Sequence, residues 1–211
     1  MEIFCIEKIP STHAYMCEAV RKGEIKEACA IYALEQSAGL GSRENEWQSS
    51  KGNLHLNFCL NLSELPSDLN LSSTSIYFSF ILKELLAAKG SALWLKWPND
   101  FYLGDKKIGG VISAKIKDFI IVGVGLNLIS APFNAGVLDI RLDLAGLVKE
   151  YVKEIQKRIL WKQIFSKYML EFEKSKTYSV HYEGVKVPLN EALLYEDGSI
   201  LLQNKRIYSL R

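Results

Sequence analysis

The chain has 211 residues, of which 48% are hydrophobic and 24% are charged, and its formal net charge is +2. This composition is typical of a globular protein with a real core, and the charge is too small to indicate nucleic-acid binding by itself. The four cysteines form no CxxC pair and the three histidines form no HxxxH cluster. These spacings disfavour a protein-ligated zinc and indicate reduced thiols.

The N-terminal segment is predicted to form a strand followed by a helix. Residues 3–9 make a short apolar strand that ends at Pro10. Ser11 or Thr12 then caps a helix that runs to about Lys22, where a glycine follows as the stop. The exposed N–H groups at this helix N-terminus also suit an anion or a polar ring. Because the first twelve residues mix charges with one short apolar run, we expect neither a signal peptide nor a membrane span, and a cytoplasmic location.

A long polar loop follows the second predicted strand, residues 27–36. Residues 37–47 contain two glycines and few apolar side chains, which is typical of a plain surface loop or of a lid that orders over a ligand. Residues 52–62 alternate apolar and polar side chains, which predicts a half-buried strand with His55 as a strand-face residue rather than a catalytic base. Residues 75–89 are apolar nearly all round, so we expect a buried helix.

Residues 93–128 are predicted to form an antiparallel meander. Short apolar runs alternate there with tight polar turns, such as the Asn-Asp pair after Pro98 and a Gly-Asp hairpin signal at Gly104. Gly123 and Gly125 are two residues apart and therefore face the same side of their strand. They leave that side bare, so a planar or rod-like ligand can lie against the backbone.

Charged side chains stand at the turns of this meander, namely Lys96, Asp100 and Lys107. Two ammonium groups and a carboxylate suit a polyphosphate with Mg²⁺, because lysines neutralise phosphate oxygens and the carboxylate binds the hard cation. Asn127 follows the bare strip and offers a carboxamide to a ligand or to the water shell of a metal. A lone lysine or glycine is usually solvated or a packing point. The concentration of these residues within one short stretch predicts an anion or nucleotide site.

The C-terminal part is predicted to be helical and then β-structured. Residues 143–175 are too long for one ordinary helix, so we expect two helices with a break near Lys157. The short strands predicted after Thr177 are too few to be stable alone and should lean on the main domain. The expected fold is α+β, a mixed sheet flanked by helices, with residues 1–174 as one domain and residues 175–211 as a small second one.

Three motifs resemble those of the biotin protein ligases: KWPND at 96–100, KIGG at 107–110 and GVGLN at 123–127. Residues 36–47 are similar to the biotin- and adenylate-binding loop of that family, although Leu40 and Ser42 stand where arginine is common. The resemblance implies a class II aminoacyl-tRNA synthetase-like catalytic domain with a small C-terminal SH3-like β-barrel. It also implies the short form of the family, without an N-terminal helix-turn-helix.

The resemblance further implies ATP-dependent, Mg²⁺-assisted conversion of biotin to biotinyl-5′-adenylate, followed by transfer to a lysine of the biotin carboxyl carrier protein of acetyl-CoA carboxylase. Neither DNA nor a membrane is an expected partner, and the resemblance is compatible with a homodimer. Catalysis is assigned to Lys107, Asp100 and Lys96, and no protein-ligated metal is expected, since Mg²⁺ would be held mainly by phosphates near Asn127. The residues implied to bind biotin or the adenylate are Ser11, Thr12, His13, Gln36, Gly39, Leu40, Gly41, Ser42, Arg43, Trp47, Lys107, Gly109, Gly110, Gly123, Gly125 and Asn127.

Two other interpretations stay open. A lipoate ligase shares the fold and the adenylate chemistry, although KWPND followed by KIGG favours biotin. A non-catalytic biotin-binding module is the second, because Leu40 and Ser42 replace two arginines in the lid.

Overall fold

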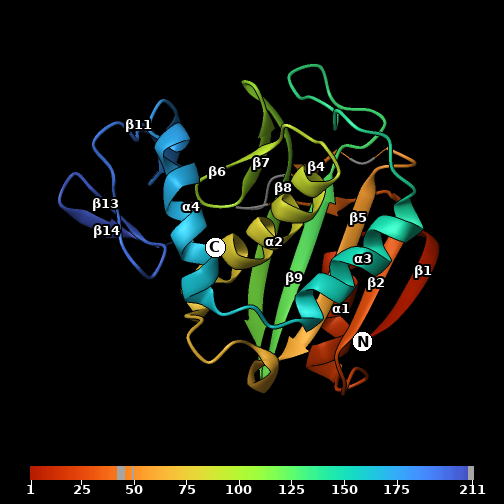
Figure 1. Cartoon of the computed structure of the whole chain (residues 1–211). Coiled ribbons are helices and arrows are strands. Elements are labelled where there is room, and N and C mark those ends of the chain that lie inside the picture. Colours follow the sequence, from red (N-terminus) through yellow and green to blue (C-terminus); the bar gives the residue numbers. More distant parts are fainter. Residues whose placement is uncertain (42–45, 49, 209–211) are drawn as a thin grey trace.

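The computed structural model describes residues 1–41, 46–48 and 50–208. Its centre is a seven-stranded mixed sheet in the order β1-β2-β5-β9-β8-β7-β6 (Figure 1). β1 and β2 are parallel, and the other neighbouring strands are antiparallel, so the predicted meander is confirmed as β6 to β9. The strands are β1 (Glu2–Ile9), β2 (Cys29–Gln36), β5 (Leu54–Asn61), β6 (Trp94–Lys96), β7 (Asp100–Leu103), β8 (Lys106–Ile116) and β9 (Phe119–Leu126).

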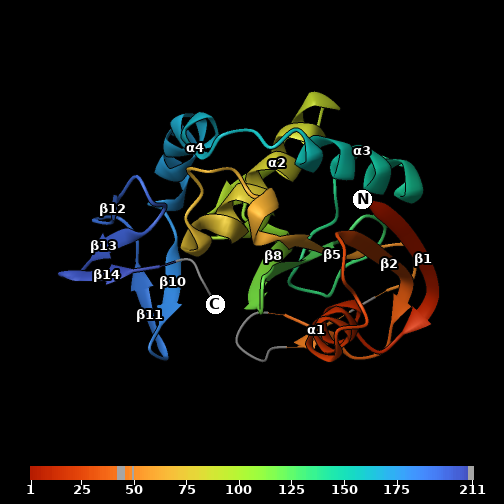
Figure 2. The same ribbon diagram turned by 90° about the horizontal axis from the view of Figure 1, so that it is seen from below.

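Helices cover both faces of this sheet. α1 (Thr12–Lys22) lies on one face, and α2 (Thr74–Ala88), α3 (Leu144–Gln156) and α4 (Trp161–Ser175) lie on the other (Figure 2). The break between α3 and α4 confirms the expected interruption of the long helical segment. Within the described part of the chain, no helix is long and apolar enough to cross a membrane.

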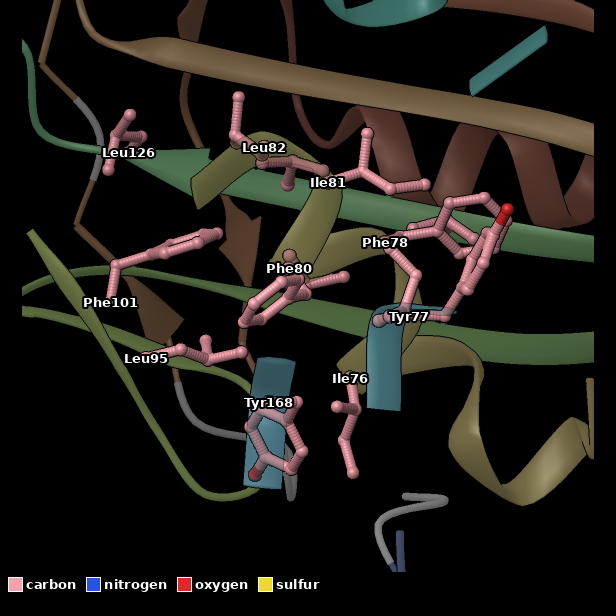
Figure 3. Close-up of a cluster of buried hydrophobic side chains, with 14 of the residues drawn as sticks. Ile76, Tyr77, Phe78, Phe80, Ile81, Leu82, Leu95, Phe101, Leu126 and Tyr168 are labelled. Atoms are coloured by element: carbon pink, nitrogen blue, oxygen red, sulfur yellow. The ribbon is translucent and has the colours of Figure 1, made fainter. Parts of the chain in front are cut away.

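The main core lies between the sheet and the layer of α2, α3 and α4. Phe80 of α2 packs edge-on against Tyr168 of α4, with 6.0 Å between ring centroids (Figure 3). Phe58 of β5 makes the same kind of contact with Phe78 at 5.0 Å. Edge-to-face packing of this kind adds to the free energy gained by burying the rings. A second, smaller cluster under α1 contains Met16, Cys17, Val20, Ile31, Cys59 and Ile121.

The prediction that β5 is half-buried is wrong. All of its positions except the last are buried, because α1 packs on the face that the alternating pattern assigned to solvent. His55 and Asn57 are therefore interior polar side chains, and each needs a hydrogen-bond partner to offset its loss of water.

The C-terminal strands form two small sheets. β10 (Ser179–Tyr182) pairs with β11 (Val185–Pro188), and a second sheet contains β12 (Leu193–Leu194), β13 (Ile200–Leu202) and β14 (Lys205–Ile207). As described, these strands do not close into one hydrogen-bonded barrel.

This tail is tied to the main domain by tryptophans. The Trp97 indole N–H donates to the carbonyl of Gly198 at 2.9 Å, and that of Trp161 donates to the carbonyl of Glu196 at 2.7 Å. Buried tail residues also join the main core. The tail therefore leans on the main domain, as expected, and the division after residue 174 stays a prediction.

Two buried tyrosines give a matched test of the core. The Tyr151 hydroxyl donates to the carbonyl of Phe78 at 2.8 Å, whereas the described residues offer the Tyr168 hydroxyl no hydrogen-bond partner. Both side chains are fully buried. We expect Tyr151→Phe to lower the free energy of unfolding by about 1 kcal/mol, because a buried hydrogen bond is lost. Tyr168→Phe should be neutral or stabilising. Urea unfolding measures both, and equal losses would contradict the assignment.

Candidate active site

The register of the sheet builds a trough with a floor of glycine. His55 of β5 pairs with Gly125 of β9, Gly125 pairs with Gly110 of β8, and Gly110 pairs with Asp100 of β7. At about 4.8 Å per strand spacing, this row spans about 14 Å from β5 to β7. The two central positions have no side chain, so a ligand can lie against the backbone between His55 and Asp100.

A second row runs beside the first. Asn57 of β5 pairs with Gly123 of β9, which pairs with Ile112 of β8. A Cβ added at Gly123 would lie 3.1 Å from both the Asn57 Oδ1 and the His13 Nδ1 atoms. Gly123 and Gly125 therefore face the same side of β9, as predicted, but the strip is not bare at its Gly123 end, where His13 and Asn57 crowd it.

A directed hydrogen-bond network closes the β5 end of the trough. The Thr12 N–H and hydroxyl both donate to Gln36 Oε1, at 2.8 and 2.9 Å, and Asn57 Nδ2 donates to the Thr12 hydroxyl at 2.8 Å. His13 Nδ1 lies 2.8 Å from Asn57 Oδ1. Because that oxygen accepts, Nδ1 of His13 carries the proton and Nε2 accepts from the Cys17 thiol at 3.6 Å. This end of the trough is polar and uncharged.

The two histidines of the site are both neutral near pH 7. Burial lowers the pKa of His13 and the nearby Arg21 lowers it further, whereas the hydrogen bond that His13 donates to Asn57 opposes the shift. Burial also lowers the pKa of His55, although its hydrogen bond to the Ser50 carbonyl opposes the shift. Removing an imidazolium from water disfavours the charged form, which is the common cause.

The opposite end of the trough is charged. The Lys107 ammonium lies 2.6 Å from Asp100 Oδ1, and both side chains are partly exposed. A Cβ added at Gly110 would lie 3.1 Å from that same Oδ1 atom, so the glycine leaves room for the ion pair. An ion pair that reaches solvent contributes little to stability. It is placed to exchange partners with an incoming anion.

Trp47 covers the middle of the trough. β3 (Gly39–Leu40) pairs with β4 (Glu46–Trp47) in a short hairpin above the sheet. The indole rests on Gly125, where an added Cβ would lie 2.8 Å from its Cε2 atom. The space left is about 50 Å³, enough for one or two water molecules. A larger ligand therefore requires the indole to move.

The sequence-predicted residues fall into two groups. Those that line the trough are Thr12, His13, Gln36, Leu40, Gly41, Trp47, Asp100, Lys107, Gly110, Gly123 and Gly125. Ser42 and Arg43 lie outside the described residues. The remaining predicted residues, Ser11, Gly39, Lys96, Gly109 and Asn127, are placed beside the trough or behind it.

Each residue of the second group has a structural contact. Ser11 caps α1 by accepting from the Ala14 N–H at 3.3 Å, and Gly39 pairs with Trp47 in the hairpin. The Lys96 ammonium lies 5.4 Å from the centroid of the Tyr102 ring. Gly109 permits close packing, because an added Cβ would lie 2.5 Å from the Gly125 carbonyl oxygen. Asn127 Nδ2 donates to the carbonyl of Gly136 at 3.1 Å.

Sequence reasoning missed three polar lining residues, His55, Asn57 and Asn99. His55 and Asn57 alternate with leucine and phenylalanine in β5, and only the position of α1 shows that they face a site. Asn99 sits in the KWPND motif, and its Nδ2 donates to the carbonyl of Val111. The KWPND motif is the sequence feature that could have identified Asn99 as a lining residue.

Comparison with known proteins agrees with this site. The model of the biotin/lipoate A/B protein ligase family matches residues 5–127 of the chain. The chain belongs to this family. The matched segment contains every lining residue of the trough.

Curated relatives of the family are similar over part of their length. The bifunctional ligase/repressor BirA of Escherichia coli is 32% identical over 149 residues, which make up 66% of this chain and 45% of that protein. The biotin–(acetyl-CoA-carboxylase) ligase of Mycobacterium tuberculosis is 24% identical over 71% of this chain and 61% of its own length. The match thus spans about half the length of these relatives.

Solved structures match over nearly the whole chain. The biotin acetyl coenzyme A carboxylase synthetase of Helicobacter pylori, crystallised with bound biotinylated ATP, has a TM-score of 0.93 and 38% identity, covering 98% of this chain and 99% of that one. The biotin protein ligase of Aquifex aeolicus, in complex with biotin and ATP, has a TM-score of 0.77 at 22% identity, with coverages of 100% and 96%. These likenesses confirm the expected biotin-ligase-like fold, a mixed sheet flanked by helices with small C-terminal strands.

The lowered pKa values of the two histidines predict how stability depends on pH. An unfolded chain takes up protons at His13 and His55 near pH 6.5, whereas the folded chain does so only at lower pH. The free energy of unfolding should therefore fall as the pH drops below about 6.5, by up to about 1.4 kcal/mol per pH unit for each histidine.

Urea unfolding between about pH 7.5 and 5.5 measures this slope. His13→Asn should make the fall shallower, because one of the two buried imidazoles is removed. A slope that is the same in His13→Asn and in the wild-type protein would contradict the buried neutral state.

Proposed function

We propose that this chain is a biotin protein ligase, which uses ATP to convert biotin to biotinyl-5′-adenylate and then biotinylates a lysine of a biotin carboxyl carrier protein. The observation that carries the proposal is the trough, whose glycine floor joins an uncharged polar end to the Lys107–Asp100 pair. An acid with a polar head and a carboxylate tail matches these two ends. The names and bound molecules of the relatives support the same choice.

In the first step, biotin lies along the trough with its carboxylate toward Lys107. A carboxylate oxygen attacks the α-phosphorus of ATP, the bond from that phosphorus to the bridging oxygen breaks, and pyrophosphate leaves with the electron pair. Lys107 gives up its contact with Asp100 and neutralises the negative charge that gathers on the phosphoryl oxygens. No side-chain nucleophile is needed, so catalysis rests on positioning and on charge stabilisation. Lys96, buried beside Tyr102, adds positive charge on the side of β7.

In the second step, the amine of the acceptor lysine attacks the acyl carbon of the adenylate and AMP leaves. The amine must lose a proton as the amide forms. Asp100 is the one acidic side chain among the described residues that line the trough, and it accepts this proton in our proposal. The acceptor has to reach the adenylate across the trough, so the Trp47 hairpin opens for this step as well.

Mg²⁺ enters the proposal as an ion carried by the phosphates. The described residues contain no group of three or more His, Cys, Asp or Glu side chains that could hold a metal. Asp100 offers one carboxylate, and the described residues offer no hydrogen-bond donor to the buried Oδ1 of Asn127. These oxygens fit a hard cation that keeps most of its ligands on phosphate and water. When bound, the ion neutralises part of the phosphate charge.

The proposal extends to compartment and assembly. The thiols of Cys5, Cys17, Cys29 and Cys59 are free, which fits a reducing compartment such as the cytoplasm. A homodimer formed through the outer edge of β1, an edge strand of the sheet, is a further prediction. The proposed activity does not involve DNA binding.

The test of the proposal is adenylate formation from purified protein, Mg²⁺ and α-labelled ATP, with biotin, lipoate or octanoate in separate reactions. We expect labelled adenylate and pyrophosphate with biotin alone. Adenylate from lipoate would identify a lipoate ligase instead. Tight biotin binding without ATP consumption would identify a non-catalytic biotin-binding module.

Lys107→Ala should slow single-turnover adenylate formation by about 10²–10³-fold, or roughly 3–4 kcal/mol of transition-state stabilisation, because one preorganised charge is removed. Lys106→Ala is the matched control, since Lys106 is the exposed neighbour in the same strand and does not line the trough. Rapid quench of labelled ATP measures both rates. A wild-type rate in Lys107→Ala would remove this residue from the mechanism.

Trp47 should report ligand entry directly. Its indole fills the trough over Gly125, whereas Trp94, Trp97 and Trp161 are buried away from it. We expect biotin to shift the tryptophan emission of the wild-type protein, because the indole leaves the trough floor and meets a new environment. The shift should disappear in Trp47→Phe. An equal shift in that variant would show that biotin binds without displacing Trp47.

A further inference from the structure

His55 is a buried side chain of the trough that the proposed chemistry leaves without a role. It lies on β5, is only 1% exposed and lines the trough at its uncharged end. Its pairing partners in the sheet are Ala33 and Gly125. Neither of these carries a polar side chain that could bond to the imidazole.

The hydrogen bonding of His55 fixes its tautomer. Nε2 lies 3.3 Å from the backbone carbonyl of Ser50. Since a carbonyl can only accept, Nε2 carries the proton and Nδ1 holds a lone pair. The described residues provide no partner for Nδ1, which is buried. An unpaired buried acceptor destabilises a protein unless a bound molecule satisfies it.

We propose that Nδ1 of His55 accepts a hydrogen bond from an N–H group of the acid substrate and makes the site selective for acids that carry one. This inference rests on the proposed function. With the carboxylate at Lys107 on β8, two strand spacings or about 10 Å from β5, the far end of the acid lies beside His55. In biotin that end is a cyclic urea with N–H groups, and octanoate and lipoate have no such donor.

The selectivity follows from desolvation. An acid without a donor displaces Trp47 and fills the trough but leaves Nδ1 unpaired. A site built to bond an N–H group discriminates strongly against ligands that lack it, because its own polar atom then stays unsatisfied. The two strand neighbours of His55 are a glycine and an alanine, so neither offers a polar side chain that could bond to Nδ1 in place of the ligand.

Three substitutions of His55 distinguish the roles of its two ring nitrogens. His55→Gln keeps an amide donor where Nε2 stood, able to reach the Ser50 carbonyl, but removes the acceptor at the δ position. His55→Phe keeps a ring and removes both. His55→Asn restores an acceptor oxygen near the δ position and gives up the bond to Ser50. Thermal melting of each variant establishes that it is folded.

The measurement is the Kd of biotin alone and of ATP alone by calorimetry, together with the ratio of kcat/KM for biotin over octanoate in adenylate formation. We expect His55→Gln and His55→Phe to weaken biotin binding and to lower the ratio by about ten- to a hundredfold. His55→Asn should recover most of both, and ATP binding should not change.

Several results would overturn the proposal. Biotin binding at wild-type strength in His55→Gln or His55→Phe would show that Nδ1 has no part in it. Equal losses of biotin affinity in His55→Gln and His55→Asn would show that the effect comes from packing of the ring. A loss of affinity for ATP only would show that the donor is the adenine amine. Failure of the wild-type protein to form any adenylate would instead refute the proposed function, while the biotin Kd would still test His55.

Discussion

The register in which β5, β9, β8 and β7 pair decides what the site contains. A shift of one residue in β9 would replace Gly123 and Gly125 on the trough side with Val122, Val124 and Leu126, because neighbouring side chains point to opposite faces. The trough would then be filled. In the observed register, the glycines of two central strands align between a histidine and an ion pair, so the shape and the polarity of the site come from one set of backbone hydrogen bonds.

Glycine weakens a strand, and three trough glycines lie in the middle of the sheet. The fold offsets this weakness on the other face. Phe80 of α2 packs there edge-on against Tyr168 of α4 (Figure 3), and Phe58 packs edge-on against Phe78. The tail adds the tryptophan hydrogen bonds to Gly198 and Glu196. The sheet can therefore keep a bare surface toward the ligand because its opposite surface is densely packed.

Much of this fold follows from local sequence. Pro10 and Ser11 mark the start of α1, the glycine at position 23 ends it in the left-handed conformation at φ 76°, and the spacing of Gly123 and Gly125 predicts one bare face. These features depend on neighbouring residues only, so pattern and turn chemistry capture them.

The features of the site that the sequence analysis did not predict share one physical cause, which is packing between segments far apart in the sequence. The alternation in β5 assigns His55 and Asn57 to solvent, but α1, far away in the sequence, covers that face. The pairing of Asp100 with Gly110 depends on a register shift in β7, which no local pattern reveals.

The central claim is that the acid lies across the sheet, with its polar head at β5 and its carboxylate at Lys107. A crystal structure of this protein with biotin and a non-reactive ATP analogue tests it most directly. We predict the urea ring beside Thr12, Asn57 and His55, the carboxylate and α-phosphate at Lys107, and the Trp47 indole displaced from Gly125. Biotin bound in the reverse direction, or outside the glycine-floored trough, would contradict the account.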